Sequence, residues 1–366
     1  MRAMEPAPGF DPSPMWRTDT MQNQRRGVAG VVVMALIAVL TATAAHAADE
    51  SAAAFYHGKQ IRFFTMGSPG GGYDTYTRTV GAFLEKKLGA KVIPTNEPAA
   101  GGMIAMNRAI NAPPDGLTLL LTGGEALVTA QLYGLSGVNY DVRKQVWLAR
   151  VSGEDKVAVF GSPSPVRTIL DMQRSEKPVV WAGSGKADNN SDFSAILCYA
   201  LGARCKIIVG YKGTGDMNLA IARGEVDGRV ISDEAAALYG TGSGMRVLAT
   251  LARNRSEKFP DVPTVFEAAQ LAPTAARLLD WRAGIAGLGR VILVTPGTPS
   301  DRIELLRSAL GEILRDPAYV AEIRKVNLAA GYASAEEVRT MVEQAMTTLD
   351  ARGLAEMKEI ALDRYY

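Results

Sequence analysis

One stretch of the sequence has the residue types and spacing of an anion-binding turn. Ile61 to Met66 reads as a buried strand, three glycines follow at positions 70 to 72, and apolar residues at helical spacing continue to Leu88. The first N–H groups of a helix have no partner within the helix, so those that follow a strand favour an anion beyond the strand's carboxyl end. Glycine lets the main chain approach a ligand closely. The same residues could equally make only a tight strand-to-helix turn.

A second stretch, Pro178 to Leu201, repeats this design without repeating the sequence. A strand at 178–182 leads into a turn of glycine and small polar residues at 183–190, and a helix follows from Ser191. The turn ends in Asp188, Asn189 and Asn190, which are residue types typical of a helix start. Two such turns on two sheets could hold one small ligand from both sides.

The sequence gives little support for a catalytic, zinc or nucleotide-binding site. The sequence has 2 histidines, and one of them, His57, precedes the first core strand, so a Ser-His-Asp or Cys-His arrangement and a zinc site are not expected. Gly183 to Lys186 resembles the end of a phosphate-binding loop, but Val180 stands at the position of the loop's first glycine and Ala187 at that of its Ser or Thr. We therefore predict no catalytic residue, no metal and no cofactor.

The first 47 residues have the pattern of a cleavable export signal. Arg25 and Arg26 precede the apolar run 28–40, and Ala45-His46-Ala47 supplies the small residues of a cleavage site. Met21 offers a second start that would give a signal of ordinary length. We expect a periplasmic protein. An oxidising compartment would allow a disulfide between Cys198 and Cys205.

Composition and pattern favour a soluble α/β protein. The chain has 366 residues, 47% hydrophobic and 21% charged, with a formal net charge of +2 and no basic stripe, so nucleic acid is not an expected partner. Strands alternate with helices over short connections, which indicates layered sheets with mainly parallel strands. We also predict a helix from Val166, a strand within Trp281 to Val294, and one helix over Ala335 to Arg352.

Eight short segments in order resemble the periplasmic substrate-binding proteins of tripartite tricarboxylate transporters, the Bug receptor family. They extend over essentially the whole of the chain after the export signal. They are Gly67 to Asp74, Asn96 to Gly102, Pro114 to Leu120, Ala182 to Gly185, Tyr211 to Gly213, Gly224 to Asp227, Pro260 to Val265 and Pro296 to Pro299.

The resemblance implies a two-domain periplasmic-binding-protein fold of the Venus flytrap type, with a hinge of crossing strands. By position, domain 1 would take residues 55–149 plus 280–366 and domain 2 residues 150–279. The ligand of such a protein is a small organic carboxylate held by main-chain donors. Carried over to this sequence, the ligand-binding residues would be Ser68, Pro69, Gly70, Gly71 and Gly72 on one side, Ser184, Gly185, Asp188, Asn189 and Ser191 on the other, and Gly123, Gly124, Glu125 and Tyr211 along the edges.

Several acidic residues depart from the family pattern. Glu125 stands where a neutral residue is common, and Asp192 replaces a frequent histidine. Glu154, Asp155, Asp188, Asp233 and Glu234 also lie near the ends of predicted strands. A cleft with this much negative charge would suit an amino-acid-like ligand better than citrate. Alternatively, these carboxylates are helix caps and first-turn residues, which favour negative charge anyway.

The resemblance implies a solute receptor without catalysis, a monomer that delivers its ligand to integral membrane transporter subunits. An exported carboxylate-dependent enzyme, a lyase or hydrolase using Asp188 and Asp192, is the alternative from a different class. A ligand sensor for a membrane kinase is a third reading.

Overall fold

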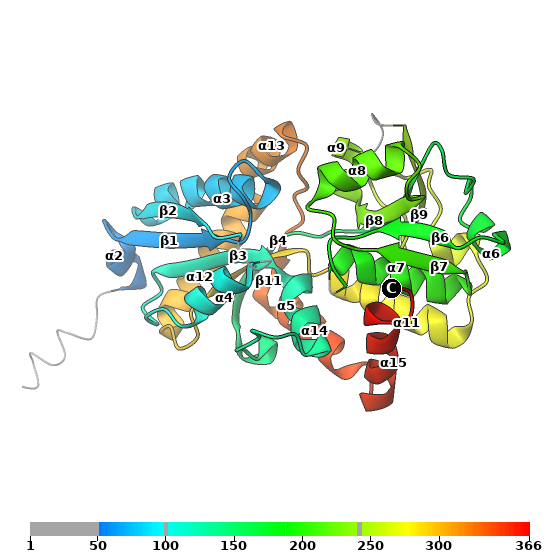
Figure 1. Ribbon diagram of the computed structural model, residues 1–366. Helices are drawn as coiled ribbons and strands as arrows, with labels where there is room; N and C mark the ends of the chain where they lie inside the picture. The colour runs from blue at the N-terminus through cyan, green and yellow to red at the C-terminus, as the bar shows by residue number, and fades with distance from the viewer. Residues whose placement is uncertain (1–50, 99–101, 187, 240–243) are drawn as a thin grey trace, which may run out of the picture. The chain divides into compact units, whose positions relative to one another are not determined.

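Two β-sheets organise the chain (Figure 1). The computed structural model describes residues 51–98, 102–186, 188–239 and 244–366, so the predicted export signal lies outside the described residues. The first sheet has the strand order β11-β4-β10-β3-β1-β2 and the second the order β7-β6-β8-β5-β9.

The first sheet begins with three parallel strands. They are β2 (Lys91–Asn96), β1 (Gln60–Thr65) and β3 (Thr118–Gly123). Antiparallel pairing continues the sheet through β10 (Arg290–Val294), β4 (Val146–Ser152) and β11 (Ala333–Ser334). Successive residues of a strand face opposite sides, so Phe63 and Phe64 enter two different cores.

Helices cover both faces of this sheet. Three of them pack on the face to which Phe63 belongs: α3 (Gly72–Leu88), α12 (Ser300–Arg315) and α13 (Pro317–Lys325). The opposite face carries α4 (Met103–Ile110), α5 (Gly124–Tyr133) and α14 (Ala335–Thr347). The short α2 (Ala52–Tyr56) precedes β1, and the 3-10 helix η2 (Val142–Lys144) precedes β4.

The second sheet follows the same plan. Its parallel strands are β7 (Cys205–Ile208), β6 (Val179–Ala182) and β8 (Gly228–Ser232), and the antiparallel β5 (Lys156–Gly161) joins β8 to β9 (Met245–Thr250). One face packs on α8 (Thr214–Ala222) and α9 (Asp233–Tyr239). The other packs on α7 (Asn189–Leu201), near α6 (Asp171–Arg174) and α11 (Pro273–Ala286). The one-turn α10 (Val265–Ala268) follows β9.

The two sheets share a core within Phe55–Tyr366, which packs as one unit. A single buried cluster extends from Phe64 and Trp147 of the first sheet to Phe160 and Trp181 of the second. Among the described residues, no helix combines the length and apolar character needed to cross a bilayer.

Three predicted segments differ from the structure. Trp281 lies in the helix α11 and not in a strand, because Leu278, Trp281 and Ile285 recur at helical spacing and bury one face. The strand begins only at Arg290, after a turn at Gly289 with φ +50°, where a side chain would collide with the carbonyl of Ser152.

The hinge of crossing strands therefore takes a different form. The outward link runs from β4 directly into β5 through residues 153–155. The return link comes from helix α11 through residues 287–289 into β10. Only the outward link joins strand to strand.

The other two differences concern helix ends. The predicted helix at Ala335 to Arg352 divides into α14 and α15 (Ala351–Leu362), because the Asp350 carboxylate accepts a hydrogen bond from Gly353 N at 2.8 Å and starts a new helix. The helix expected from Val166 is shortened to α6, which starts at Asp171. The Asp171 carboxylate accepts the backbone N–H groups of Arg167 and Thr168 and so holds the preceding residues in a turn.

Candidate functional site

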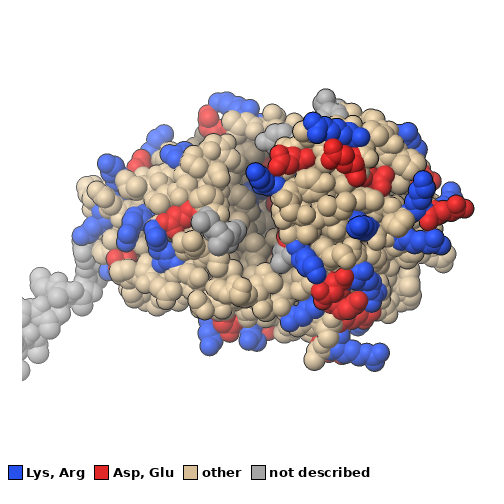
Figure 2. All heavy atoms as spheres, viewed as in Figure 1, with Lys and Arg blue, Asp and Glu red and all other residues tan. Residues whose placement is uncertain are grey.

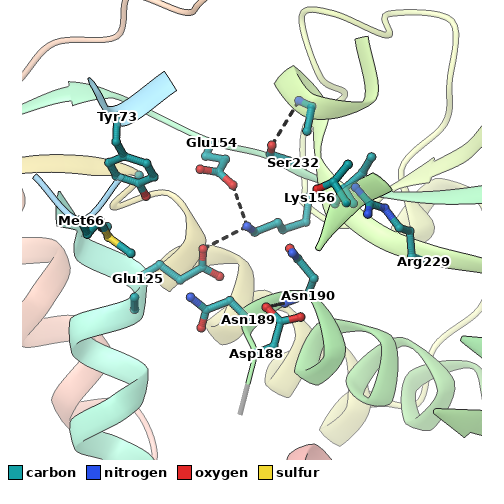
Figure 3. A pocket seen from close by; sticks show the side chains of 16 residues that line it. Met66, Tyr73, Glu125, Glu154, Lys156, Asp188, Asn189, Asn190, Arg229 and Ser232 are labelled. Carbon is teal, nitrogen blue, oxygen red and sulfur yellow. Dashed lines mark hydrogen bonds and ion pairs between the residues drawn. The ribbon is translucent and has the colours of Figure 1, made fainter. Parts of the chain in front are cut away.

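A cavity of about 190 Å³ lies between the two sheets (Figure 3). Figure 2 shows the molecular surface hollowed between the halves that carry the sheets, with acidic and basic side chains interspersed around it. The residues that line the cavity are Met66, Tyr73, Gly123, Glu125, Ala126 and Gly289 from the first sheet and its helices, Glu154 from the β4–β5 link, and Lys156, Asp188, Asn189, Asn190, Thr214, Arg229, Ile231, Ser232 and Ala235 from the second.

Two helices begin at this cavity. Helix α5 starts directly after β3 with Gly123 at its N-cap, and α7 starts after Asp188, whose carboxylate accepts a hydrogen bond from Asn190 N at 3.4 Å. Helix N-termini carry partial positive charge and unpaired N–H groups. The cavity is therefore placed to favour a negatively charged group from both sides.

Gly123 is required by close packing at this point. A Cβ atom there would lie 2.8 Å from the hydroxyl oxygen of Tyr73, which lines the cavity beside it. Burial raises the pKa of Tyr73 to about 12, although Arg290 opposes the shift, so Tyr73 presents a neutral hydroxyl.

Arg229 is a cation of the cavity that has no fixed partner among the residues that the structure describes. It lies on β8 two residues before Ile231, on the same face of the strand, and its relative exposure is 2%. Its Nε and Nη1 atoms are buried, and no acceptor within the described residues reaches them. Burial lowers the pKa of Arg229 to about 10, against the opposing charge of Asp188. A buried guanidinium with unfilled donors is a strong site for an anion.

Lys156, the other cation of the cavity, is fully paired. Its Nζ atom lies 2.7 Å from Glu154 Oε1 and 3.1 Å from Glu125 Oε2, as Figure 3 shows. Burial alone would lower the pKa of Lys156, but the two carboxylates outweigh it and the pKa is raised. Lys156 therefore holds Glu125 and Glu154 in place and has little charge left for a ligand.

A buried arginine on α11 ties the starts of the two helices together. Arg282 lies with Nε 2.8 Å from Asp192 Oδ2 and Nη2 2.7 Å from Glu125 Oε1, and Tyr133 donates its hydroxyl to Asp192 at 2.9 Å. Burial raises the pKa of Asp192 to about 6, while Arg282 opposes the shift. The pKa of Arg282 is also raised, because Asp192 and Glu125 outweigh the effect of burial.

A second buried arginine connects the first sheet to α9. Arg290 of β10 places Nη2 2.7 Å from Glu234 Oε2, and Glu234 Oε1 accepts the backbone N–H of Ala329 at 2.7 Å. Arg290 is more loosely placed against Glu154, at 3.8 Å from its Oε2 atom. Cations and carboxylates thus alternate behind the cavity wall, and they bind elements of both sheets to each other.

The first predicted turn does not line this cavity. Ser68, Pro69, Gly70, Gly71 and Gly72 form the turn between β1 and α3, but the buried carboxylate of Asp74 already fills it. Asp74 accepts the N–H of Gly70 at 2.8 Å and Nε of Arg78 at 2.9 Å. The neighbours Met66 and Tyr73 reach the cavity instead. The turn that serves the first sheet is the one from β3 into α5.

The second predicted turn is placed in part as expected. Asp188 and Asn189 line the cavity, whereas Ser184, Gly185 and Ser191 do not. The Asp188 carboxylate accepts the N–H of Ser184 at 3.4 Å and the hydroxyl of Ser191 at 3.2 Å, so Asp188 already uses both of these donors.

The remaining predicted residues divide in the same way. Gly123 and Glu125 line the cavity, but Gly124 packs under Leu288 and Val291. The cavity lining also leaves out Asp192, which is fully buried against Arg282; Asp233, whose carboxylate accepts the Ser256 hydroxyl at 2.7 Å; and the half-buried Tyr211.

Two cations of the cavity, Arg229 and Lys156, were absent from the predicted set. Both lie in segments that the sequence marks as buried strands, whereas Glu154 is one of the acidic residues that the sequence places near strand ends. The sequence could have pointed to these two cations through a charged residue within an apolar strand, because such a residue is rarely buried without a partner or a function.

Cys198 at the end of α7 and Cys205 at the start of β7 form a disulfide, with their Cα atoms 6.2 Å apart. It fixes the turn between the two elements, on the opposite end of α7 from the cavity.

Two α/β halves with a hollow between them form the architecture of periplasmic binding proteins. The family model described as the tripartite tricarboxylate transporter family receptor matches residues 76–351. The chain therefore belongs to this receptor family.

Individual proteins agree with this assignment. The chain is 26% identical to the BugT protein of Bordetella pertussis over 293 residues, which cover 79% of this chain and 86% of BugT. It is 26% identical to a UPF0065 protein of Bordetella bronchiseptica over 289 residues, 78% of this chain and 82% of that one. Among solved structures, R. palustris Rpa4515 with adipate is similar with a TM-score of 0.66 and 17% identity, covering 83% of this chain and 98% of that one.

Proposed function

We propose that the protein is an exported receptor that binds a small organic carboxylate in the cavity between its sheets and delivers it to membrane transporter subunits. The guanidinium of Arg229, which has no acceptor among the described residues, carries this proposal. Holding a buried charge without a partner among the described residues is costly, and a ligand carboxylate would reduce that cost with charge-assisted hydrogen bonds. The starts of α5 and α7 add donors and favourable dipoles around the same space.

The wider family supports a carboxylate as ligand. The R. palustris protein named above was solved with adipate, which is a carboxylate. The family description names a transporter, so integral membrane subunits are the proposed partners, and a monomeric periplasmic receptor is the proposed form.

We propose that the protein has two domains, or lobes, that move relative to each other. Residues 55–149 with 280–366 contain the first sheet except for the end of β4 at residues 150–152, and residues 150–279 contain the strands of the second sheet. Helix α15 is the exception, since it packs on α7 although its sequence position places it with the first lobe. Ligand binding would favour the closed arrangement of the lobes, as in other two-lobed receptors.

A receptor accounts for the site better than the carboxylate-dependent enzyme. That enzyme would use Asp188 and Asp192 together, but Asp192 does not line the cavity and is paired with Arg282 at 2.8 Å. A sensor for a membrane kinase would use the same binding step and differs only in its partner.

Thermal melting of the purified protein against small carboxylates tests the proposal. A ligand that binds only the folded state stabilises it by RT ln(1 + [L]/Kd), which is about 2.7 kcal/mol at a hundredfold excess over Kd. We expect saturable stabilisation by at least one carboxylate, with the ligand recovered unchanged after incubation. Consumption of the ligand would contradict the receptor, and an absence of stabilisation by any carboxylate would contradict the proposed site.

A further inference from the structure

The charged side chains around the cavity differ in whether their charge and hydrogen-bonding atoms already have partners. Three carboxylates line it, from Glu125, Glu154 and Asp188, against two cations, Lys156 and Arg229. The lining therefore carries one negative charge more than it has positive charges. Behind the wall the balance is even, because Arg282 is matched by Asp192 at 2.8 Å and Arg290 by Glu234 at 2.7 Å.

Arg229 can bind one carboxylate of a ligand. It is the cavity-lining cation whose donors are unfilled within the described residues, whereas Lys156 is shared between Glu125 and Glu154. A second carboxylate on the ligand would find no free cation among the lining residues that the structure describes, and it would face groups of its own charge.

Glu154 offers the ligand a hydrogen-bond acceptor, where Arg229 offers donors. Its Oε1 atom accepts a hydrogen bond from Lys156 at 2.7 Å, but among the described residues its Oε2 atom has no hydrogen-bond donor, and Arg290 lies 3.8 Å from it. The side chain is 12% exposed, toward the cavity that it lines. Glu154 Oε2 can therefore accept a hydrogen bond from a donor on the ligand.

The cavity, at about 190 Å³, suits a small ligand. Arg229 lies on one side of the lysine-centred cluster and Tyr73 and Met66 lie on the other, as Figure 3 shows.

We infer that the cavity takes a small zwitterion, with its one carboxylate on Arg229 and a protonated amine against Glu154. This inference rests on the proposed function and names the ligand class of the same site. A zwitterion leaves the excess charge of the lining unchanged, a simple monocarboxylate adds one negative charge, and a dicarboxylate adds two.

Calorimetric titration with four-carbon acids tests the inference. The probes are butanoate, 4-hydroxybutanoate, 2- and 4-aminobutanoate and butanedioate, which differ mainly in the group that accompanies the first carboxylate. We expect one of the aminobutanoates to bind at least tenfold more tightly than butanoate, 4-hydroxybutanoate and butanedioate. Butanedioate or 4-hydroxybutanoate binding as tightly as both amino acids would overturn the inference but keep the carboxylate receptor. Binding of none of the acids would overturn both the inference and the proposed site.

Charge-neutralising variants give an independent readout. Glu154→Gln should shift the ratio of the Kd values for butanedioate and the preferred aminobutanoate by at least tenfold toward butanedioate. Asp188→Asn should shift it in the same direction, and it serves if Glu154→Gln does not fold. Glu304→Gln, which neutralises an exposed carboxylate on α12, is the matched control and should leave the ratio unchanged. An unchanged ratio in a folded Glu154→Gln or Asp188→Asn protein would contradict the inference.

Discussion

Replacing Arg229 by methionine should have opposite effects on stability and on binding. The guanidinium is 2% exposed and unpaired within the described residues, so the ligand-free protein bears the cost of burying it. Methionine has a similar length and no charge. The variant should therefore be more stable than the natural protein without ligand, and it should lose most of its affinity for carboxylates.

The pKa of Arg229 sets the size of the stability effect. Burial lowers it from 12.5 to about 10, so the folded protein releases this proton more easily than the unfolded chain does. Below pH 10 the charge is present in both states, and the shift corresponds to about 3 kcal/mol of lost stability at neutral pH. For the unit Phe55–Tyr366, with unfolding entropy near 2.1 cal/mol/K per residue, that amounts to roughly 5 °C in Tm.

The loss of affinity follows from the hydrogen bonds. Two charge-assisted bonds contribute roughly 1.5 to 3 kcal/mol each, so their removal should weaken binding by about 100-fold or more. Arg229→Lys keeps the charge but loses the bidentate geometry, so it should bind with intermediate affinity.

Differential scanning fluorimetry and calorimetric titration measure the two effects. Arg62→Met is the matched control, because Arg62 is an exposed arginine on a strand, and it should change neither quantity appreciably. Affinity within threefold of the natural protein in Arg229→Met would refute the assignment of Arg229 as the anchor. A lower Tm without ligand would refute the argument about its uncompensated charge.

Three further predictions concern stability. Burial, together with the charge of Asp233, raises the pKa of Asp155 to about 6, so between about pH 4 and pH 6 the folded protein binds a proton that the unfolded chain has lost, and stability falls as the pH rises through this range. The variant Asp155→Asn should therefore be more stable than the natural protein by roughly 1 to 3 kcal/mol at pH 7.5 and equally stable near pH 4. A stability difference that does not depend on pH would contradict this prediction. Arg282→Met strips two buried carboxylates of their cation and should cost about 3 to 5 kcal/mol in urea unfolding, so a loss below about 1 kcal/mol would be inconsistent with the ion pairs described. Removing the disulfide by the double change of Cys198 and Cys205 to alanine frees a loop with a sequence separation of 7 and should cost about 2 to 3 kcal/mol, whereas an unchanged Tm would show that the crosslink does not form.

Much of the fold could be predicted because local pattern and tertiary packing agree. The strand, glycine turn and helix at 60–88 combine a short apolar run, glycines and an apolar helical face, and the structure has β1 and α3 there. The Trp281 region was misread because its aromatic and aliphatic residues fit either period over a short window. The break between α14 and α15 depends on one side-chain cap at Asp350, which a continuous apolar periodicity conceals.

The site was harder to predict than the fold. Glycine turns mark where donors can collect, but the sequence does not show that Asp74 and Asp188 occupy those donors from within. The ion pairs join residues that are far apart in the sequence, such as Asp192 and Arg282 at a separation of 90 positions, so no local spacing predicts them. Arg229 was visible as a charge in a buried strand, yet its lack of a partner appears only in three dimensions.

A crystal structure of the protein with a bound small carboxylate tests the central claim most directly. Our account predicts the carboxylate oxygens at about 2.7 to 2.9 Å from the guanidinium nitrogens of Arg229, in the hollow between the starts of α5 and α7. A carboxylate seated in the turn at Ser68 to Gly72, or Arg229 turned onto a protein carboxylate while the ligand lies elsewhere, would contradict it.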